Sequence, residues 1–263
     1  MTYEASRSRV VSSFTIVKGS LIDETYTAFE NWDFSMSKQG NLRLMQEANT
    51  IGSQSQSWLR DVRKVLNRRF EPDGRDRPLV ELAQGKCDLL VWRPLLLWHM
   101  TRDEFLVRDF VTDWLYQQFV AGTYRLRPSD VVTYLRSLAK KKGIVWSGSW
   151  SSSTTERVAS GLLRIAADFG LLTGGTVKEF ASYHLPDESF LYLVYAVAQF
   201  EPNARRIIES REWRLFLMDA SDVERELLRL HQFHRLQYDA AGSLARLDLP
   251  ADSPGSYARE LVA

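Results

Sequence analysis

Apolar residues recur about every three to four positions over most of the chain, which is the spacing of one face of an amphipathic α-helix. Turn-forming residues at 71–78 and a glycine at 122 interrupt this pattern. In the first 122 residues it predicts a helix that begins after Ser20 as its N-cap and helices over residues 41–48, 54–70, 79–84, 89–99 and 103–121. We therefore expect a helical N-terminal domain over residues 1–100.

The next part of the chain adds a glycine turn to the helices. A helix is predicted over residues 128–142. A capping box of Ser153 and Glu156 predicts a second helix over residues 154–169. The glycine pair 174–175 then separates two short stretches that are predicted to pair as a β-hairpin. The order helix, helix, hairpin is that of a winged helix-turn-helix unit.

The same order of elements recurs toward the C-terminus. Helices are predicted over residues 186–200 and 203–210, and a capping box of Ser221 and Glu224 predicts a third. A second hairpin is predicted to turn at residues 242–243. The predicted architecture is mainly α, with the helical domain at 1–100, a winged helix-turn-helix unit at 101–185, and a second winged-helix-like unit with a C-terminal tail at 186–263, both units having short β-hairpin wings.

The distribution of charge singles out one stretch of the chain. The net charge is only +1, and the first 122 residues hold equal numbers of basic and acidic side chains. Residues 123–164 hold eight basic and two acidic side chains, whereas residues 165–263 hold ten basic and fifteen acidic ones. Positive charge concentrated in this way indicates a local surface for a polyanion.

The basic stretch coincides with the predicted helix-turn-helix. The second helix of such a pair lies in the DNA major groove, and Arg157, Ser160 and Arg164 are predicted to point outward from it. Arginine suits both guanine edges and phosphates, although a solvated helix face would give the same pattern. The candidate residues for binding double-stranded DNA are Lys140, Lys141, Lys142, Thr154, Thr155, Arg157, Ser160, Arg164 and Lys178.

The helix predicted over residues 54–70 offers a second possible nucleic-acid surface, for RNA or DNA. Its residues are Arg60, Arg63, Lys64, Arg68 and Arg69, and a solvated helix face is the alternative interpretation. In the second winged unit, Arg225, Arg229 and Gln232 also align on one face. Acidic residues crowd the start of that helix and would repel phosphate, so we assign the unit a structural or protein-contact role.

Cysteine and histidine usage gives no sign of a catalytic or metal site. Cys87 is the single cysteine, so it cannot form an internal disulfide, and we expect it to be a small buried hydrophobic residue. His231 and His234 lie three residues apart, but no cysteine or paired carboxylate completes a metal site. The sequence has neither a Gly-Lys-Ser/Thr phosphate loop nor a Gly-x-Ser-x-Gly nucleophile motif. We expect no catalytic residues, no metal, no cofactor and no enzymatic activity.

The hydropathy pattern argues against a membrane protein. The longest apolar run, Ser189–Phe200, lies between two glutamates and is shorter than the about 20 residues that span a bilayer. The N-terminus is polar and lacks the apolar segment of a signal peptide. We therefore expect a cytoplasmic protein with no membrane partner.

Several short blocks resemble the BrxA proteins of bacteriophage exclusion (BREX) defence systems. The blocks are Lys18-Gly19-Ser20-Leu21 with Glu30-Asn31-Trp32-Asp33, Arg157 to Leu172, His184 to Glu188, and Glu224 to Pro250. The resemblance implies a small helical DNA-binding component of a phage-defence operon, with an N-terminal part similar to the NusB antitermination fold. It implies no active-site residues.

These observations together predict a non-catalytic, double-stranded-DNA-binding accessory protein of a phage-defence complex, working with other defence proteins. Two alternatives stay open from the sequence. The acidic C-terminal part favours a scaffold whose winged units bind proteins, and the basic helix at 54–70 favours an RNA-binding factor.

Overall fold

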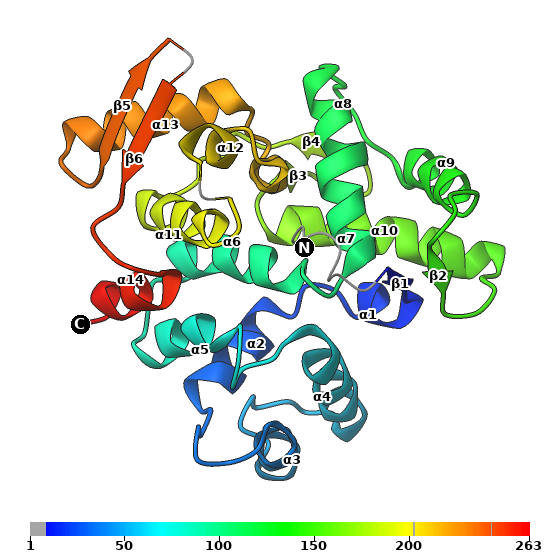
Figure 1. Cartoon of the computed structure of the whole chain (residues 1–263). Helices are drawn as coiled ribbons and strands as arrows, with labels where there is room; N and C mark the ends of the chain where they lie inside the picture. Colours follow the sequence, from blue (N-terminus) through cyan, green and yellow to red (C-terminus); the bar gives the residue numbers. More distant parts are fainter. Residues whose placement is uncertain (1–8, 202, 243) are drawn as a thin grey trace.

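The computed structural model describes residues 9–201, 203–242 and 244–263. Over this part of the chain it is mainly helical, with three small two-stranded sheets (Figure 1). The N-terminal elements are β1 (Val10–Val11), α1 (Ser13–Lys18), α2 (Ile22–Glu30), α3 (Lys38–Ala48), α4 (Gln56–Arg69), α5 (Arg77–Gln84) and α6 (Leu89–Met100). Helices α3 to α6 confirm the predicted helices in this region.

The start of the chain differs from the prediction in two ways. Helix α1 was not predicted, and α2 begins at Ile22 with Leu21, not Ser20, as its N-cap. Leu21 adopts a left-handed conformation with φ of 56°. The Ser20 hydroxyl instead donates a hydrogen bond to Asp168 at 2.7 Å, far along the chain. A tertiary contact has therefore replaced the expected local cap.

The central region begins with one long helical segment. Its elements are α7 (Phe105–Asp109), the π-helix η2 (Phe110–Leu115), α8 (Tyr116–Val120), α9 (Pro128–Leu138), β2 (Val145–Trp146), α10 (Ser152–Asp168), β3 (Leu172–Thr173) and β4 (Glu179–Phe180). The run from α7 through η2 to α8 confirms the helix predicted over 103–121. The antiparallel pair β3–β4 confirms the hairpin around residues 174–175.

Both helices of the predicted pair have different ends from those expected. Helix α9 ends at Leu138, its last buried residue, and not near Lys142. The N-cap of α10 is Ser151, whose hydroxyl accepts a hydrogen bond from the backbone N–H of Thr154 at 3.2 Å. The capping box predicted at Ser153 and Glu156 was therefore wrong by two residues, because the five consecutive hydroxyl residues 151–155 compete for the cap.

The C-terminal elements are α11 (Asp187–Ala198), α12 (Ala204–Ile208), the 3₁₀ helix η3 (Arg211–Phe216), α13 (Ala220–Gln232), β5 (Gln237–Ala241), β6 (Leu244–Asp248) and α14 (Pro254–Leu261). A capping box does open α13, but it joins Asp219 and Asp222 and not Ser221 and Glu224. Strands β5 and β6 form the second predicted hairpin, with Ser243 of its predicted turn outside the described residues. Helix α14 was not predicted.

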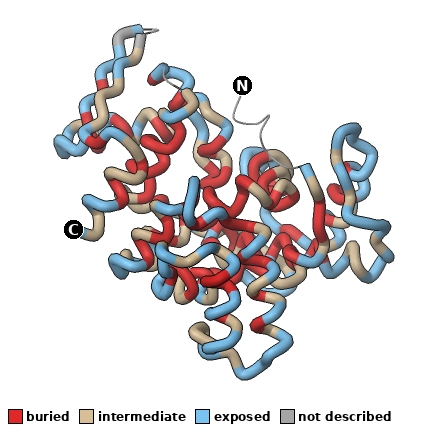
Figure 2. Tube along the Cα trace, turned by 60° about the horizontal axis from the view of Figure 1, so that its bottom comes forward, coloured by how far each residue is buried: buried red, intermediate tan, exposed pale blue. Residues whose placement is uncertain are grey.

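One continuous cluster of buried apolar side chains joins the N-terminal, central and C-terminal elements. Figure 2 shows these buried segments running through the middle of the molecule, with the exposed segments around them. Helix α14 contributes by packing against α5 and α11, which brings the end of the chain back to the N-terminal helices. Two short parallel strands, β1 and β2, tie the N-terminal segment to the loop between α9 and α10.

Candidate nucleic-acid interface

The three consecutive lysines lie in the loop that leads from α9 to β2. Lys140, Lys141 and Lys142 are all exposed. The Lys141 ammonium lies 3.9 Å from a carboxylate oxygen of Asp109, whereas Lys140 and Lys142 form no ion pair with another described residue. The loop therefore presents two unneutralised positive charges and one that is partly neutralised.

The start of α10 lies close to this loop in sequence and is rich in hydroxyl groups. The Ser151 hydroxyl lies 3.0 Å from the hydroxyls of both Ser153 and Thr154. Thr155 donates to the Ser151 carbonyl at 3.0 Å, and Thr154 and Thr155 are both half-buried. The N-terminus of a helix of this length attracts anions through its unpaired N–H groups and its dipole.

Arg157 and Ser160 are exposed on α10, as expected, but the guanidinium of Arg164 forms a hydrogen bond with another part of the chain. Its guanidinium donates to the carbonyl of Val17 at 3.0 Å, at the end of α1. Helix α1 packs closely there, because a Cβ atom at Gly161 would lie 3.0 Å from the Ile16 carbonyl oxygen. The C-terminal half of the outward face of α10 is thus flanked by α1, and the N-terminal half stays open.

Lys178 lies at the hairpin β3–β4. Its ammonium donates to the Gly174 carbonyl at 2.6 Å, which closes the turn. Its backbone pairs with Leu126, both N–H groups donating to the carbonyl across, at 2.8 and 2.9 Å. Lys178 is half-buried and is therefore held more firmly than a solvated wing lysine.

The second predicted surface, on α4, is only partly a surface. Arg60 and Lys64 are exposed, and Arg63 donates to Gln46 at 3.1 Å. Arg68 is half-buried and donates to the Val10 carbonyl at 3.1 Å.

The prediction that Arg69 belongs to the basic surface of α4 was wrong, because its side chain is 0% exposed. It donates to the carbonyls of Thr15, Gly19 and Ser20 at 2.9 to 3.0 Å and pairs with the buried Glu104 at 3.3 Å. Burial lowers the pKa of Arg69, with the negative charge of Glu104 opposing that shift. Arg69 is thus a structural anchor.

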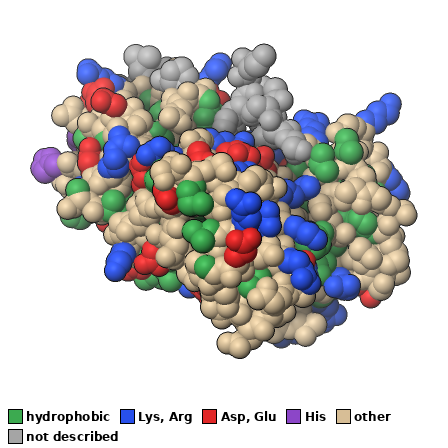
Figure 3. Space-filling view, turned by 90° about the horizontal axis from the view of Figure 1, so that it is seen from below, with side chains coloured by type: hydrophobic (Ala, Val, Ile, Leu, Met, Phe, Trp, Pro, Cys, Tyr) green, Lys and Arg blue, Asp and Glu red, His purple; other side chains and the backbone are tan. Residues whose placement is uncertain are grey.

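Helix α1 lies between the two predicted basic surfaces and brings them next to each other. Its Lys18 pairs with Asp61 of α4 at 2.5 Å, and its C-terminal carbonyl at Val17 receives Arg164 of α10. Figure 3 shows Lys and Arg side chains gathered over one part of the face seen from below. The sequence gives no local signal for this neighbourhood, so Arg9 and Lys18 were missed as members of it.

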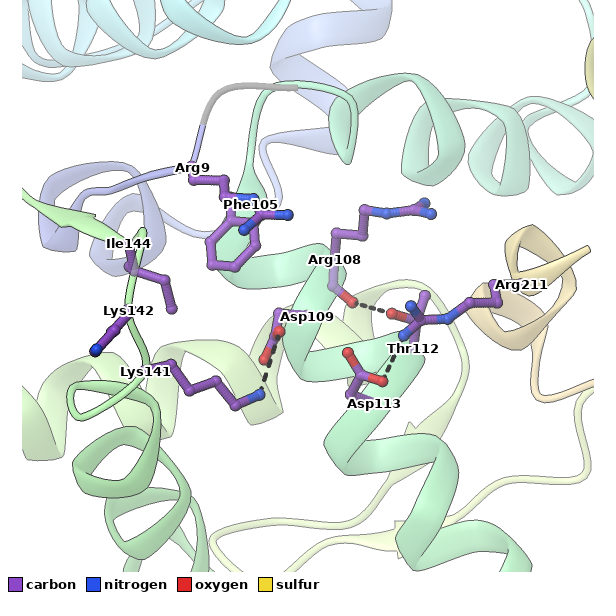
Figure 4. A pocket seen from close by; sticks show the side chains of 10 residues that line it. All are labelled: Arg9, Phe105, Arg108, Asp109, Thr112, Asp113, Lys141, Lys142, Ile144 and Arg211. Atoms are coloured by element: carbon purple, nitrogen blue, oxygen red, sulfur yellow. Dashed lines mark hydrogen bonds and ion pairs between the residues drawn. The ribbon is translucent and has the colours of Figure 1, made fainter. Parts of the chain in front are cut away.

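A pocket of about 240 Å³ opens beside the lysine loop (Figure 4). Its basic side chains come from distant parts of the chain: Arg9, Arg108, Lys141, Lys142 and Arg211. Three of these have acidic partners. Arg211 pairs with Asp113 at 2.6 Å, Arg108 forms two hydrogen bonds with Glu212 at 2.7 and 2.8 Å, and Lys141 lies 3.9 Å from Asp109.

Asp109 lies on the floor of this pocket between the basic groups. Burial raises its pKa, while a hydrogen bond from the Tyr134 hydroxyl at 2.7 Å and the Lys141 charge oppose that shift. Burial also raises the pKa of Tyr134 well above its ordinary value. Five basic side chains line the pocket against two acidic ones, Asp109 and Asp113. Lys141 and Lys142 belong both to this lining and to the lysine loop.

Cys87 and His231, whose side chains were considered for chemistry from the sequence, contribute to packing and hydrogen bonding in the fold. Cys87 is half-buried and not fully buried, and burial raises its pKa to about 11. His231 accepts a hydrogen bond from the backbone N–H of Tyr238 at 3.2 Å. Within the described residues, no group of three His, Cys, Asp or Glu side chains is placed to hold a metal ion. No helix in that same part of the chain has the length and apolarity needed to cross a bilayer.

Comparison with known proteins places the chain in a family. No curated protein matches the sequence. The sequence model of the BrxA family matches residues 13–195, which is more than half of the chain and runs from α1 into α11. The chain belongs to the BrxA family of bacteriophage exclusion (BREX) phage-defence proteins.

Proposed function

We propose that this protein is a non-catalytic accessory component of a BREX system that binds double-stranded DNA through a winged helix-turn-helix unit. The observation that carries the proposal is that Lys140 and Lys142, in the connection leading to α10, and Arg157, in the second turn of α10, are exposed and form no ion pair with another described residue. These groups suit the phosphates that supply most of the affinity in protein–DNA complexes.

The order of the central elements supports a winged unit. The helical segment ending in α8 leads to an extended residue, Leu126, and then to α9, α10 and the hairpin β3–β4. Leu126 pairs with Lys178 next to β4, so the hairpin gains a third short strand. In a winged helix, this arrangement places the second helix of the pair, here α10, on the DNA-binding side.

The connection between α9 and α10 is longer than the turn of a simple helix-turn-helix. Residues 139–151 contain the three lysines and the strand β2, which is fastened to β1. The pairing with β1 holds the loop at its middle, between the lysines and the start of α10. We therefore assign Lys140–Lys142 to backbone phosphates flanking the groove and Arg157 to the groove itself.

The adjoining α4 surface extends the proposed contact. Arg60 and Lys64 are exposed on it, and α1 connects it to α10. A duplex lying across α10 would reach these side chains on one side of its path. Arg164 and Lys178, which are held by carbonyl groups, contribute less than the sequence alone suggests.

The test is fluorescence anisotropy of the full chain with duplex DNA, single-stranded DNA and RNA at two salt concentrations. If four phosphates are neutralised, log affinity falls with log salt with a slope of about −3.6, since each contact contributes about 0.9. Replacing Lys140, Lys141 and Lys142 by alanine should weaken binding to every duplex and make this slope shallower by up to about 3. The matched control removes three exposed charges elsewhere, at Arg205, Arg206 and Arg246.

Arg157→Ala separates two modes of contact. Loss of a base contact costs about 1–3 kcal/mol on a preferred site and less on random DNA, whereas loss of a phosphate contact weakens both alike. Equal duplex affinity for the parent, the triple-lysine variant and Arg157→Ala would overturn the proposed surface. Tighter binding of RNA than of duplex DNA, lost on replacing Arg60 and Lys64, would assign the chain to RNA.

A second function, contact with another defence protein, is favoured by α13. Leu228 and Phe233 on or beside this helix are 45% and 65% exposed. Arg229, between them, is held by Asp187 and Glu226. Exposed apolar side chains beside a neutralised arginine suit a protein contact better than DNA. Replacing both apolar residues by serine should leave duplex affinity unchanged and weaken assembly with the other BREX proteins in size-exclusion chromatography; unchanged assembly would remove this candidate.

A further inference from the structure

A cleft rich in arginine lies away from α10, where the N-terminal helices meet the end of the chain. It has a volume of about 340 Å³ and is bounded by the starts of α5 and α14 and by side chains of α6 and α11. The guanidinium groups that line it are those of Arg75, Arg77, Arg102 and Arg259, and the acidic side chain among the described lining residues is Glu81.

Arg102 is the most firmly positioned of the four. Its side chain is only 10% exposed and lies over the ring of Trp98, with 4.0 Å from the guanidinium carbon to the ring centroid. It also donates to the Arg75 carbonyl at 3.3 Å and lies 3.7 Å from the buried carboxylate of Asp76. An arginine stacked on an indole and fixed by a backbone carbonyl is pre-organised to meet an anion with little loss of side-chain entropy.

The other three arginines line the more open part of the cleft. Arg77 and Arg259 share one carboxylate, Glu81, with N–O distances of 2.8 and 3.5 Å. Arg75 pairs with Asp103. The exposed fraction of the side chain is 51% for Arg77, 61% for Arg259 and 41% for Arg75. Asp76 also lies 3.7 Å from Arg75, so the four guanidiniums face three carboxylates, Glu81, Asp103 and Asp76, and one positive charge remains in excess.

Two helix N-termini meet at the same cleft. Arg77 and Pro78 begin α5, and Pro254 and Gly255 begin α14, and all four residues line the cleft. The positive end of the α14 dipole therefore adds to the field of the arginines, whereas the buried carboxylate of Asp76, the N-cap of α5, offsets part of the positive end of that helix. Helix starts and arginines converging on one cavity form the usual protein environment for phosphate oxygens.

The floor of the cleft is fixed by a buried hydrogen-bonded chain. The Tyr192 hydroxyl lies 2.8 Å from His99 Nε2, and His99 Nδ1 lies 2.6 Å from Asp76. Burial lowers the pKa of His99, so its ring stays neutral at neutral pH. Tyr192 lines the cleft, and this chain holds its hydroxyl at a set position.

We propose that this cleft binds a phosphate group, carried either by a free nucleotide or by the 5′ end of a nucleic acid strand. Arg77 and Arg259 would meet the outer phosphate oxygens and Arg102 the inner ones. The inference does not rest on duplex binding at α10, because it uses other residues and another face of the molecule.

The test is isothermal titration of the full chain with inorganic phosphate, AMP and ATP, and with a short single strand that carries or lacks a 5′-phosphate. The parent should bind at least one of these phosphates. The double variant Arg77→Gln/Arg259→Gln should bind it at least tenfold more weakly, whereas Arg205→Gln/Arg206→Gln should match the parent. Both variants change exposed side chains, and thermal unfolding verifies that they fold.

The outcomes separate the two phosphate sources. If AMP or ATP binds, and the cleft variant Arg77→Gln/Arg259→Gln binds it more weakly, the ligand of the cleft is a nucleotide. Binding of only the 5′-phosphorylated strand, weakened in the same way, assigns a strand end. No binding by the parent, or equal binding by the parent and the cleft variant, overturns the proposal. The triple-lysine variant at Lys140–Lys142 should keep full phosphate binding in the cleft, so failure of one proposal leaves the other testable.

Discussion

Replacing Arg69 by methionine is expected to destabilise the folded protein without removing any exposed basic side chain. The guanidinium of Arg69 ties α4 to the segment between α1 and α2 through three backbone carbonyls and pairs with Glu104. Methionine keeps the apolar volume but removes every one of these contacts. Glu104, 1% exposed, would keep Arg68 at 3.6 Å and the Thr15 hydroxyl at 3.0 Å as partners.

The magnitude follows from what the substitution leaves behind. Removing one partner of a buried ion pair costs about 3–5 kcal/mol, because the remaining charge stays buried and poorly compensated. Adding the separate energies of the four Arg69 hydrogen bonds would give a larger cost. The carbonyl groups at the end of α1 can bind water once α1 loosens, however, and this lowers the cost. We expect a loss of about 4 kcal/mol in the free energy of unfolding, out of the roughly 5–15 kcal/mol typical of a native protein.

Urea and thermal unfolding, followed by tryptophan fluorescence and circular dichroism, measure this loss. At about 2–4 °C for each kcal/mol, the melting temperature should fall by roughly 10 °C. Arg60→Met on the exposed face of α4 is the matched control and should stay within about 0.5 kcal/mol of the parent. Adding Glu104→Gln to Arg69→Met should recover part of the loss, because it removes the stranded charge. An Arg69→Met protein as stable as Arg60→Met would refute the anchoring role.

Two further changes test other parts of the fold. Gly161→Val places methyl groups against the Ile16 carbonyl and should cost about 1–3 kcal/mol by overpacking α1 on α10, measured by urea unfolding; no cost would mean that α1 does not pack there. Burial lowers the pKa of His99, so on acidification the unfolded chain takes up a proton at His99 before the folded chain does. The free energy of unfolding should therefore decline as pH falls below about 6.5, and His99→Gln should lose this part of the pH dependence.

The amphipathic pattern was enough to predict most helices, because packing of an apolar face decides where a helix forms. Helices α3 to α5 and α10 illustrate this, and the glycine pair at 174–175 predicted the β3–β4 hairpin. The errors lie at helix ends. Around Ser151 and Asp219 several residues could serve as the cap, and their differences in cap energy are smaller than the packing energies that set the position of the helix.

The candidate site was harder to predict than the fold, since side-chain partners are set by long-range contacts. Arg60 and Arg69 look equivalent in the sequence of α4, yet one is exposed and the other wholly buried. The distinguishing feature is Glu104, 35 residues away from Arg69, whose position no local pattern reveals. The same holds for Arg164, whose carbonyl partner at Val17 is 147 residues distant.

The short helix α1 explains why the two basic surfaces have to be considered together. It has six residues, too few for a stable isolated helix, so its conformation depends on its neighbours. Arg69 and Lys18 hold it to α4, and Arg164 holds it to α10. Loosening α1 would therefore change the relative position of Arg60 and Lys64 on one side and Arg157 on the other. A stability variant such as Arg69→Met should consequently weaken binding to duplexes long enough to touch both surfaces, and affect shorter ones less.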